Sequence, residues 1–426
     1  MKLLVSTWGL PSRWSNSVYD LNGVTCNSCT TLKLLHGNYD RVLVIVLDSI
    51  LDSGEKSNME SECSKCFYKH RQDFTYGSYA DLLEKVRVTI SGTLECLGIQ
   101  NADVIVLPAA GSPSGNWVFQ GNMKDYLSIG LIDLYEHVKK LGNIREIAID
   151  LTHGINFMPS LSFRMAQIIS QFAFLNNESQ DNQNGVHFSA YNSDPFTSIY
   201  NLKINKVYDE RVTSVEIPGY LPHKVFMRSE KIDTNTDSID QEFEDVVKPL
   251  ISSVFYPLPL ALSYFCGRRF SGDLRGAWED NISIVGATVR RKLSPDPVAV
   301  QAVILADILS SKVEAGFSIR DLKAINERIY GRISGIHHFL AGHELSKINV
   351  VIEKYRGQLP ATLAKVMEEE KNTGTTRSDA PIERADKRIM MAHAGLQKEF
   401  VIIKRDKKIG YAEDPRKILR DAGMLL

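Results

Sequence analysis

The chain has 426 residues, with 43% hydrophobic residues, 24% charged residues and a formal net charge of −1 at pH 7. These values are typical of a globular protein with two or three domains, and they exclude nucleic-acid binding through bulk charge. No signal peptide is visible, and the longest apolar run, Pro249 to Cys266, is interrupted by Pro257 and Pro259. We therefore expect a cytoplasmic protein that does not span a membrane.

The first half of the chain alternates apolar runs with amphipathic stretches, which predicts an α/β domain with a Rossmann-like parallel sheet over residues 1–205. The predicted strands are Lys2–Ser6, Arg41–Leu47, Asp103–Leu107, Glu146–Ile149, Val186–Tyr191 and Ser198–Leu202. The predicted helices are Thr30–Leu35, Tyr79–Leu97, Met123–Lys140 and Phe157–Leu175. A dinucleotide-binding enzyme would carry Gly-x-Gly-x-x-Gly after the first strand, whereas this chain has Thr7-Trp8-Gly9-Leu10-Pro11.

Four of the six cysteines form two closely spaced pairs, Cys26-x2-Cys29 and Cys63-x2-Cys66. We place both pairs on loops after the first two strands, where they could meet. Four thiolates at this spacing can hold zinc, but the flanking residues lack the usual glycine-rich turns. Disulfides are plausible inside hyperthermophile cells and unusual in others. We rank reduced thiols or disulfides above zinc.

Polar loops follow the predicted strands, and the densest of them is Asp150-Leu151-Thr152-His153-Gly154-Ile155-Asn156. Because the carboxyl ends of parallel strands meet at one edge of a sheet, side chains from several loops should surround one ligand. The predicted ligand-binding residues are Thr7, Trp8, Gly9, Asp48, Gly111, Ser112, Asp150, Thr152, His153, Gly154 and Asn156. An ordinary strand-to-helix turn with capping residues is the alternative for the densest loop.

The second half of the chain has a different pattern. Residues 206–291 are irregular and predict a connector domain, with one interrupted helix at Gln241–Phe255. Residues 292–426 predict a helical domain, with helices at Val298–Val313, Ile319–Phe339 and Glu344–Tyr355. A polar segment, Lys371–Arg384, predicts a mobile loop. Phe400–Ile403 and Ile409–Tyr411 predict a small hairpin.

Near the C-terminus, Arg388 and His393 have four residues between them in an apolar segment that predicts a helix. Histidine exchanges protons near neutral pH, and the planar fork of arginine suits phosphate oxygens. Together they could cut RNA without metal, by helping the ribose 2′-hydroxyl attack the adjacent phosphate. The alternative is an ordinary helix with an exposed arginine and a half-buried histidine. We expect no metal site, because His337, His338 and His343 make a poor ligand set.

Both ends of the chain resemble one family. The Asp150–Asn156 loop and the segment Ser6-Thr7-Trp8-Gly9-Leu10-Pro11-Ser12-Arg13-Trp14 are similar to the ligand-sensing CARF domain of CRISPR-associated proteins. Arg388-x4-His393, followed by Ala394-Gly395-Leu396, is similar to the HEPN ribonuclease signature. In this order the motifs resemble the CARF–HEPN ribonucleases of type III CRISPR systems, in the Csx branch. Many members carry a polar residue after the arginine, where this chain has Ile389.

The resemblance implies a CRISPR-associated endoribonuclease for antiviral defence, with Arg388 and His393 as catalytic residues. It implies that cyclic oligoadenylate, with cyclic tetraadenylate as the expected ring, binds the sensor domain and activates cleavage of single-stranded RNA, with no cofactor. It also implies a homodimer, or an assembly of dimers, in which two Arg388–His393 motifs form one site. The alternative is a nucleic-acid-binding regulator that responds to the same messenger and has no nuclease activity. A sensor domain that also degrades its ligand is a third possibility.

Overall fold

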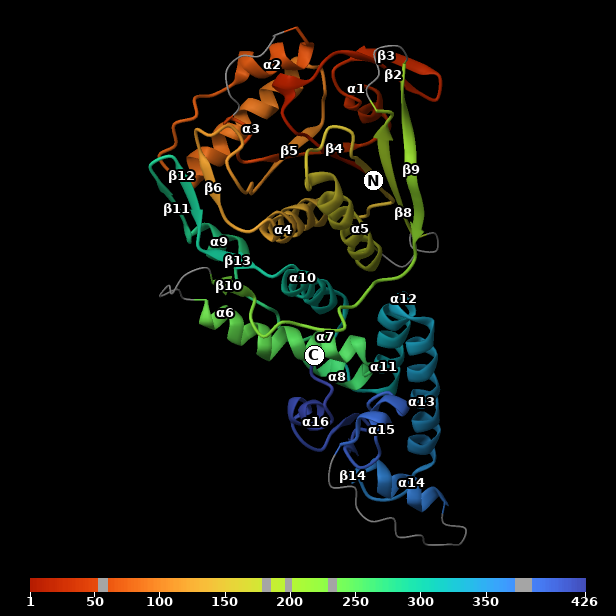
Figure 1. Ribbon diagram of the computed structural model, residues 1–426. Helices are drawn as coiled ribbons and strands as arrows, with labels where there is room; N and C mark the ends of the chain where they lie inside the picture. Colours follow the sequence, from red (N-terminus) through yellow and green to blue (C-terminus); the bar gives the residue numbers. More distant parts are fainter. Residues whose placement is uncertain (53–59, 178–184, 196–200, 229–235, 372–384) are drawn as a thin grey trace. The chain divides into compact units, whose positions relative to one another are not determined.

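The computed structural model describes residues 1–52, 60–177, 185–195, 201–228, 236–371 and 385–426 (Figure 1). The chain divides into two compact units. Unit 1 contains Met1–Thr213, Val225–Thr236 and Asp273–Gln301, and unit 2 contains Ser214–Lys224, Asp237–Gly272 and Ala302–Leu426. The predicted connector, residues 206–291, is thus shared between both units and does not form a third one.

Unit 1 is built on an eight-stranded sheet with the order β3-β2-β9-β8-β7-β1-β4-β5. The strands are β1 (Lys2–Thr7), β2 (Ser17–Leu21), β3 (Val24–Ser28), β4 (Arg41–Leu47), β5 (Ala102–Leu107), β7 (Glu146–Asp150), β8 (Val186–Ser193) and β9 (Leu202–Val212). Strands β8, β7, β1, β4 and β5 are parallel neighbours, which confirms the predicted parallel sheet. Of the last predicted strand, Ser198–Leu202, residues 198–200 lie outside the described residues, and Leu202 begins β9, which is antiparallel to β8.

Helices connect the parallel strands. They are α1 (Leu32–Leu35), α2 (Glu62–His70), α3 (Tyr79–Cys96), α4 (Lys124–Leu141) and α5 (Met158–Asn176). Helix α2 packs on α3, and α4 packs on α5 (Figure 1). The right-handed crossover rule places these two pairs on opposite faces of the sheet. The central strands are therefore covered on both sides, and Leu3, Leu4 and Val5 of β1 are fully buried.

Later segments of the chain return to complete unit 1. Strand β12 (Thr288–Arg291) pairs with β11 (Ile282–Val285) and with β6 (Val118–Gln120). Strand β13 (Leu293–Pro295) pairs with β10 (Phe226–Arg228), and α9 spans Leu274–Glu279. These pairings join residues far apart in the sequence, which is why the irregular pattern of 206–291 did not reveal them.

Four of the six cysteines form disulfide bonds, which is one of the arrangements that the sequence left open. Cys29 is bonded to Cys63 and Cys66 to Cys96, while Cys26 and Cys266 are free thiols. Each closely spaced pair is therefore divided. Their predicted position on loops was wrong for Cys26, which lies in β3, and for Cys63 and Cys66, which lie in α2. Both bonds tie α2 to neighbouring segments.

Unit 2 is mostly helical. Its helices are α6 (Asp237–Glu242), α7 (Lys248–Phe255), α8 (Pro259–Phe265), α11 (Ile319–Ile325), α12 (Gly331–Ile333), α13 (Gly335–Lys354), α14 (Leu363–Lys371), α15 (Lys387–Ala392) and α16 (Pro415–Asp421). Helix α10 (Pro297–Lys312) begins in unit 1 and ends in unit 2. The predicted hairpin is confirmed as β15 (Val401–Ile403) and β16 (Ile409–Tyr411). A third strand, β14 (Ala361–Thr362), pairs with β15.

In unit 2, one prediction was wrong and another falls on residues that the structure does not describe. The single helix predicted at Ile319–Phe339 is broken at Ser334, whose backbone is extended. The Ser334 hydroxyl caps the start of α13 by accepting a hydrogen bond from the His337 N–H. The predicted mobile loop falls on residues 372–384, which lie outside the described residues. Among the helices that the structure describes, none is long and apolar enough to cross a membrane.

Candidate functional sites

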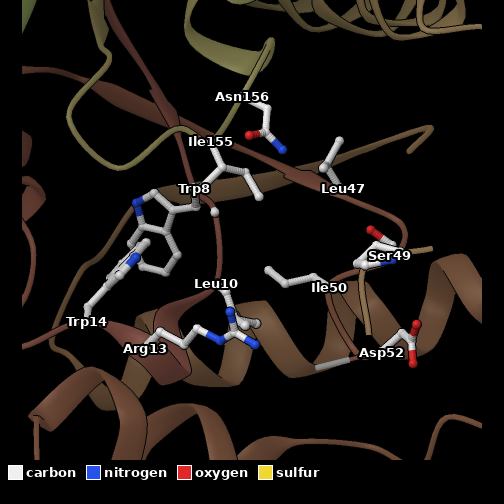
Figure 2. A pocket seen from close by; sticks show the side chains of 12 residues that line it. Trp8, Leu10, Arg13, Trp14, Leu47, Ser49, Ile50, Asp52, Ile155 and Asn156 are labelled. Atoms are coloured by element: carbon white, nitrogen blue, oxygen red, sulfur yellow. The ribbon is translucent and has the colours of Figure 1, made fainter. Parts of the chain in front are cut away.

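A cavity of about 390 Å³ opens at the carboxyl edge of the sheet in unit 1 (Figure 2). Four loops line it, those after β1, β4, β5 and β7, and they contribute among others Arg13, Ser49, Pro113 and Asn156. The chain runs from β1 to β4 and β5 on one side, and from β7 to β8 on the other, so the strand order reverses at β1. Ligands of open α/β sheets bind in the crevice at such a point.

Three of the predicted ligand-binding residues line this cavity: Trp8, Gly9 and Asn156. Asn156 has a φ of 52°, in the left-handed region that asparagine tolerates better than most residues. It is exposed and lies two residues before the start of α5. A polar side chain held in an uncommon backbone conformation at a pocket is a feature of functional loops.

His153 does not line the cavity, but it contacts Trp14, which does. Its ring stacks on Trp14 with 4.2 Å between centroids, and its Nε2 accepts a hydrogen bond from the Thr31 N–H at 3.3 Å. Burial lowers the pKa of His153 to about 4, although the nearby Asp150 opposes this shift. The ring is therefore neutral near pH 7, so it cannot supply positive charge to an anionic ligand.

Arg13 can supply that charge. It ends the short 3-10 turn Pro11–Arg13, its side chain is exposed, and it points along the cavity beside Leu10 (Figure 2). Within the described part of the chain, no carboxylate pairs with it. Arg13 and Trp14, in the loop after β1, were not among the predicted ligand-binding residues. A cation and an aromatic ring in a loop after the first strand were the signal that could have found them.

The buried carboxylate of Asp150 holds two loops together. It accepts hydrogen bonds from the hydroxyls of Ser6 and Thr31, at 3.0 and 2.8 Å, and from the Thr152 N–H at 3.1 Å. Thr7 donates to the Asp150 carbonyl, and the Thr152 hydroxyl accepts from the Ser193 N–H. These predicted residues are occupied with protein partners, so the geometry favours a supporting role for them.

Asp48 has a similar position after β4. It is fully buried, pairs with Arg291 from β12, and accepts hydrogen bonds from the Tyr79 hydroxyl and the Ala109 N–H. Burial raises the pKa of Asp48, while the Arg291 charge acts in the opposite direction. Asp48 thus fixes the loop that carries Ser49 into the cavity wall, and does not reach the cavity itself.

The predicted glycines and Ser112 shape the loops. A Cβ on Gly154 would lie 2.6 Å from Thr7 Oγ1, so a side chain at this position would crowd the end of β1. A Cβ on Gly9 would lie 2.6 Å from Ile155 Cγ2. Gly111 has a φ of 102° and bridges to Phe119, and the Ser112 hydroxyl donates to the Trp117 carbonyl.

The second candidate site is in unit 2. Asp386 caps α15 by accepting hydrogen bonds from the Arg388 and Ile389 N–H groups. Arg388 follows on the exposed surface, and in the part of the chain that the structure describes its guanidinium has no ion-pair partner. His393 ends the helix with its side chain 48% exposed. Both predicted catalytic side chains are therefore accessible to a large substrate.

The backbone after His393 turns sharply. Ala394 and Gly395 have positive φ angles of 50° and 73°, and the Gly395 N–H bonds to the Met390 carbonyl. A Cβ on Gly395 would lie 2.8 Å from Leu258 Cδ2, so glycine permits both the turn and the close packing. This turn holds His393 at the end of α15. The His393 Nδ1 hydrogen-bonds Glu344 of α13 at 2.9 Å.

Comparison with known proteins assigns both units. Residues 3–195 match the CARF domain of the CRISPR system endoribonuclease Csx1, and residues 336–413 match the HEPN domain of the same family. The chain is thus a CARF–HEPN protein, which joins a ligand-sensing domain to a domain of the nuclease type.

This chain belongs to the Csx1 family of CRISPR-associated proteins. It is 29% identical over 311 residues to the CRISPR system endoribonuclease Csx1 of Methanocaldococcus jannaschii. The match covers 66% of this chain, and this chain spans 60% of the length of that relative.

Proposed function

We propose that this protein is an endoribonuclease of CRISPR defence, in which cyclic oligoadenylate bound at the unit 1 cavity activates cleavage of single-stranded RNA at Arg388 and His393. The observation that carries the proposal is a pair of accessible, chemically suited side chains, Arg388 near the start of α15 and His393 at its end. The same chain also has a pocket at the edge of its sensor sheet.

The cleavage step needs only proton transfer and charge stabilisation. The 2′-oxygen of one ribose forms a bond to the adjacent phosphorus while the bond from phosphorus to the 5′-oxygen breaks. A proton leaves the 2′-hydroxyl, and another is added to the departing 5′-oxygen. Proton transfer of this kind is suited to His393. Arg388 stabilises the negative charge that develops on the phosphate oxygens. The products are a 2′,3′-cyclic phosphate and a 5′-hydroxyl.

A homodimer fits this chemistry and this pocket. Five positions on a helix turn by about 500°, so Arg388 and His393 of one chain do not share a helix face. A second copy could bring the missing partner. Helix α13, which carries Glu344, also exposes Ile336 and Phe339 at 72% and 69%, an apolar face that a second copy could cover.

Cyclic tetraadenylate is the activator that we favour. The cavity of about 390 Å³ is near the small end of ligand pockets, which span about 300–1,000 Å³. It is too small for a whole ring of four nucleotides, whereas two copies of the cavity across a two-fold axis could share a symmetric ring. Trp14 offers an aromatic surface for a base, and Arg13 offers a charge for a phosphate.

The decisive experiment is cleavage of a labelled single-stranded RNA in EDTA, with and without cyclic tetraadenylate. We expect cleavage that depends on the activator, persists in EDTA and leaves 2′,3′-cyclic phosphate ends. A substrate with a 2′-deoxyribose at the cleaved position should stay intact, because it lacks the nucleophile. Loss of activity in EDTA, or cleavage of the deoxy substrate, would contradict the proposal. Binding of RNA without cleavage would instead support a non-nucleolytic regulator.

The pocket can be tested through Arg13. Because Arg13 is exposed and unpaired in the described structure, Arg13→Ala should change stability by less than about 0.5 kcal/mol. Losing a charged hydrogen bond to a phosphate should raise the cyclic tetraadenylate concentration for half-maximal cleavage by about 10- to 100-fold. Calorimetric titration with the same ligand should show the matching loss of affinity.

The matched control for this variant is Arg41→Ala. Arg41 is also exposed, but it begins β4, at the end of the strand away from the cavity. It should leave the activation curve in place. Asn156→Gly is a second pocket variant, since glycine suits the positive φ and removes the whole side chain with its amide. If Arg13→Ala and Asn156→Gly both bind and respond like the unmodified protein, this cavity is not the messenger site.

A further inference from the structure

One buried carboxylate in unit 2 contacts the predicted catalytic histidine. Glu344 is on α13, and its side chain is only 10% exposed. Its Oε2 lies 2.9 Å from His393 Nδ1, and its Oε1 accepts a hydrogen bond from Lys347 Nζ at 2.7 Å. Both carboxylate oxygens are therefore engaged, and the carboxylate is fixed from two sides.

This contact has a definite consequence for the ring. A carboxylate can only accept, so His393 Nδ1 must carry the hydrogen. Burial raises the pKa of Glu344, but the hydrogen bonds from Lys347 and His393 outweigh it and leave the pKa lowered. The carboxylate thus remains charged near neutral pH. The Nε2 atom is the one left for substrate, in a ring whose orientation is fixed.

The residue that follows Arg388 cannot orient the His393 ring. Ile389 has no polar side-chain atom, so it offers the histidine ring no hydrogen bond. Glu344 comes from a different helix, 49 positions earlier in the chain, and reaches His393 because α15 ends beside α13. No sequence spacing would have connected the two residues.

We propose that Glu344 is a positioning residue for His393, which sets the ring tautomer and orientation so that Nε2 faces the RNA. It acts through the histidine and does not touch the substrate. The proposal rests on the nuclease function proposed above. It is the arrangement in which a carboxylate holds a histidine for proton transfer, here supplied by α13.

The test compares Glu344→Ala and Glu344→Gln under activator saturation. The alanine variant loses the acceptor, so we expect kcat to fall by about 10- to 100-fold, as for other residues that orient a functional histidine. KM should change by less than about threefold, because the interaction is needed in the transition state and not for RNA binding. Glutamine keeps an acceptor oxygen, so Glu344→Gln should recover a large part of kcat.

Nitrogen-15 spectra of histidine-labelled protein give a second readout, recorded two pH units above the ordinary pKa of histidine. The unmodified protein and Glu344→Gln should show the Nδ1–H tautomer at His393, and Glu344→Ala should lose it. A merely structural glutamate would not produce this change. The control is Glu353→Ala, an exposed glutamate on the same helix, for which we expect no effect on either readout.

The outcomes separate this proposal from the one on which it rests. If His393→Ala cleaves RNA normally, the nuclease assignment itself is wrong. If His393→Ala is inactive while Glu344→Ala keeps its kcat and the Nδ1–H tautomer, only the positioning role is overturned. Should the alanine variant fail to fold, Glu344→Gln decides: a spectrum without the Nδ1–H tautomer contradicts the proposal.

Discussion

Replacing His393 with alanine should lower the single-turnover rate of RNA cleavage by about 100- to 10,000-fold, the usual contribution of a positioned proton-transfer group. The side chain is about half exposed and ends α15, so its removal should leave unit 2 folded. Circular dichroism and calorimetric titration with cyclic tetraadenylate should therefore match the unmodified protein. The measurement is the cleavage rate at saturating enzyme and activator.

Arg388 provides an independent arm of the same test. Arg388→Ala should cost about 100- to 1,000-fold, since it removes the donor aimed at the developing charge. Arg388→Lys keeps the charge but loses the planar fork, and should recover only part of the rate. Arg405→Ala, an exposed arginine in the turn between β15 and β16, is the matched control. Rates within a few-fold of normal for both His393→Ala and Arg388→Ala would remove these residues from catalysis.

Replacing Arg291 with methionine should destabilise unit 1 by about 3–5 kcal/mol, because it leaves the Asp48 carboxylate buried without its counter-charge. Both side chains are almost completely buried, at 1% and 0% exposure. Urea unfolding can be followed by tryptophan fluorescence, and this signal is specific, because all four tryptophans, at 8, 14, 117 and 278, belong to unit 1.

The chain offers a close control for this variant. Arg290 precedes Arg291 on β12 but is exposed, so Arg290→Met should change stability by less than about 0.5 kcal/mol. The double variant Asp48→Asn with Arg291→Met should recover much of the loss, because no unpaired charge remains buried. An Arg291→Met protein as stable as Arg290→Met would show that the pair does not support the fold.

The parallel strands could be predicted because they are buried on both faces and therefore appear as continuous apolar runs. The β2–β3 hairpin was missed because its strands, at the edge of the sheet, are largely polar. Its turn did carry a signal, since Asn22-Gly23 adopts positive φ angles of 54° and 88°. Helix α2 was missed because its two cysteines were placed on a loop.

For the site, the sequence predicted the loops better than the side chains that line the cavity. Strand ends locate loops, so Trp8, Gly9 and Asn156 could be selected from position alone. Whether a polar side chain faces a ligand or a neighbouring loop depends on tertiary partners. Asp48 is occupied by Arg291, more than two hundred residues later in the chain, and Asp150 by Ser6 and Thr31. Those partners have no local signature.

The discontinuity of unit 1 limits how the gene can be rearranged. The unit is assembled from three segments, and the last of them, Asp273–Gln301, carries Arg291. A recombination event with one crossover near residue 205 would transfer Asp48 but take the residue at position 291 from the other parent. The hybrid would bury an unmatched carboxylate wherever that parent has no arginine there. Inheriting the three segments together keeps this pair intact whatever the other parent carries. Hybrid proteins made in the laboratory should be designed with the same three segments as the unit of exchange.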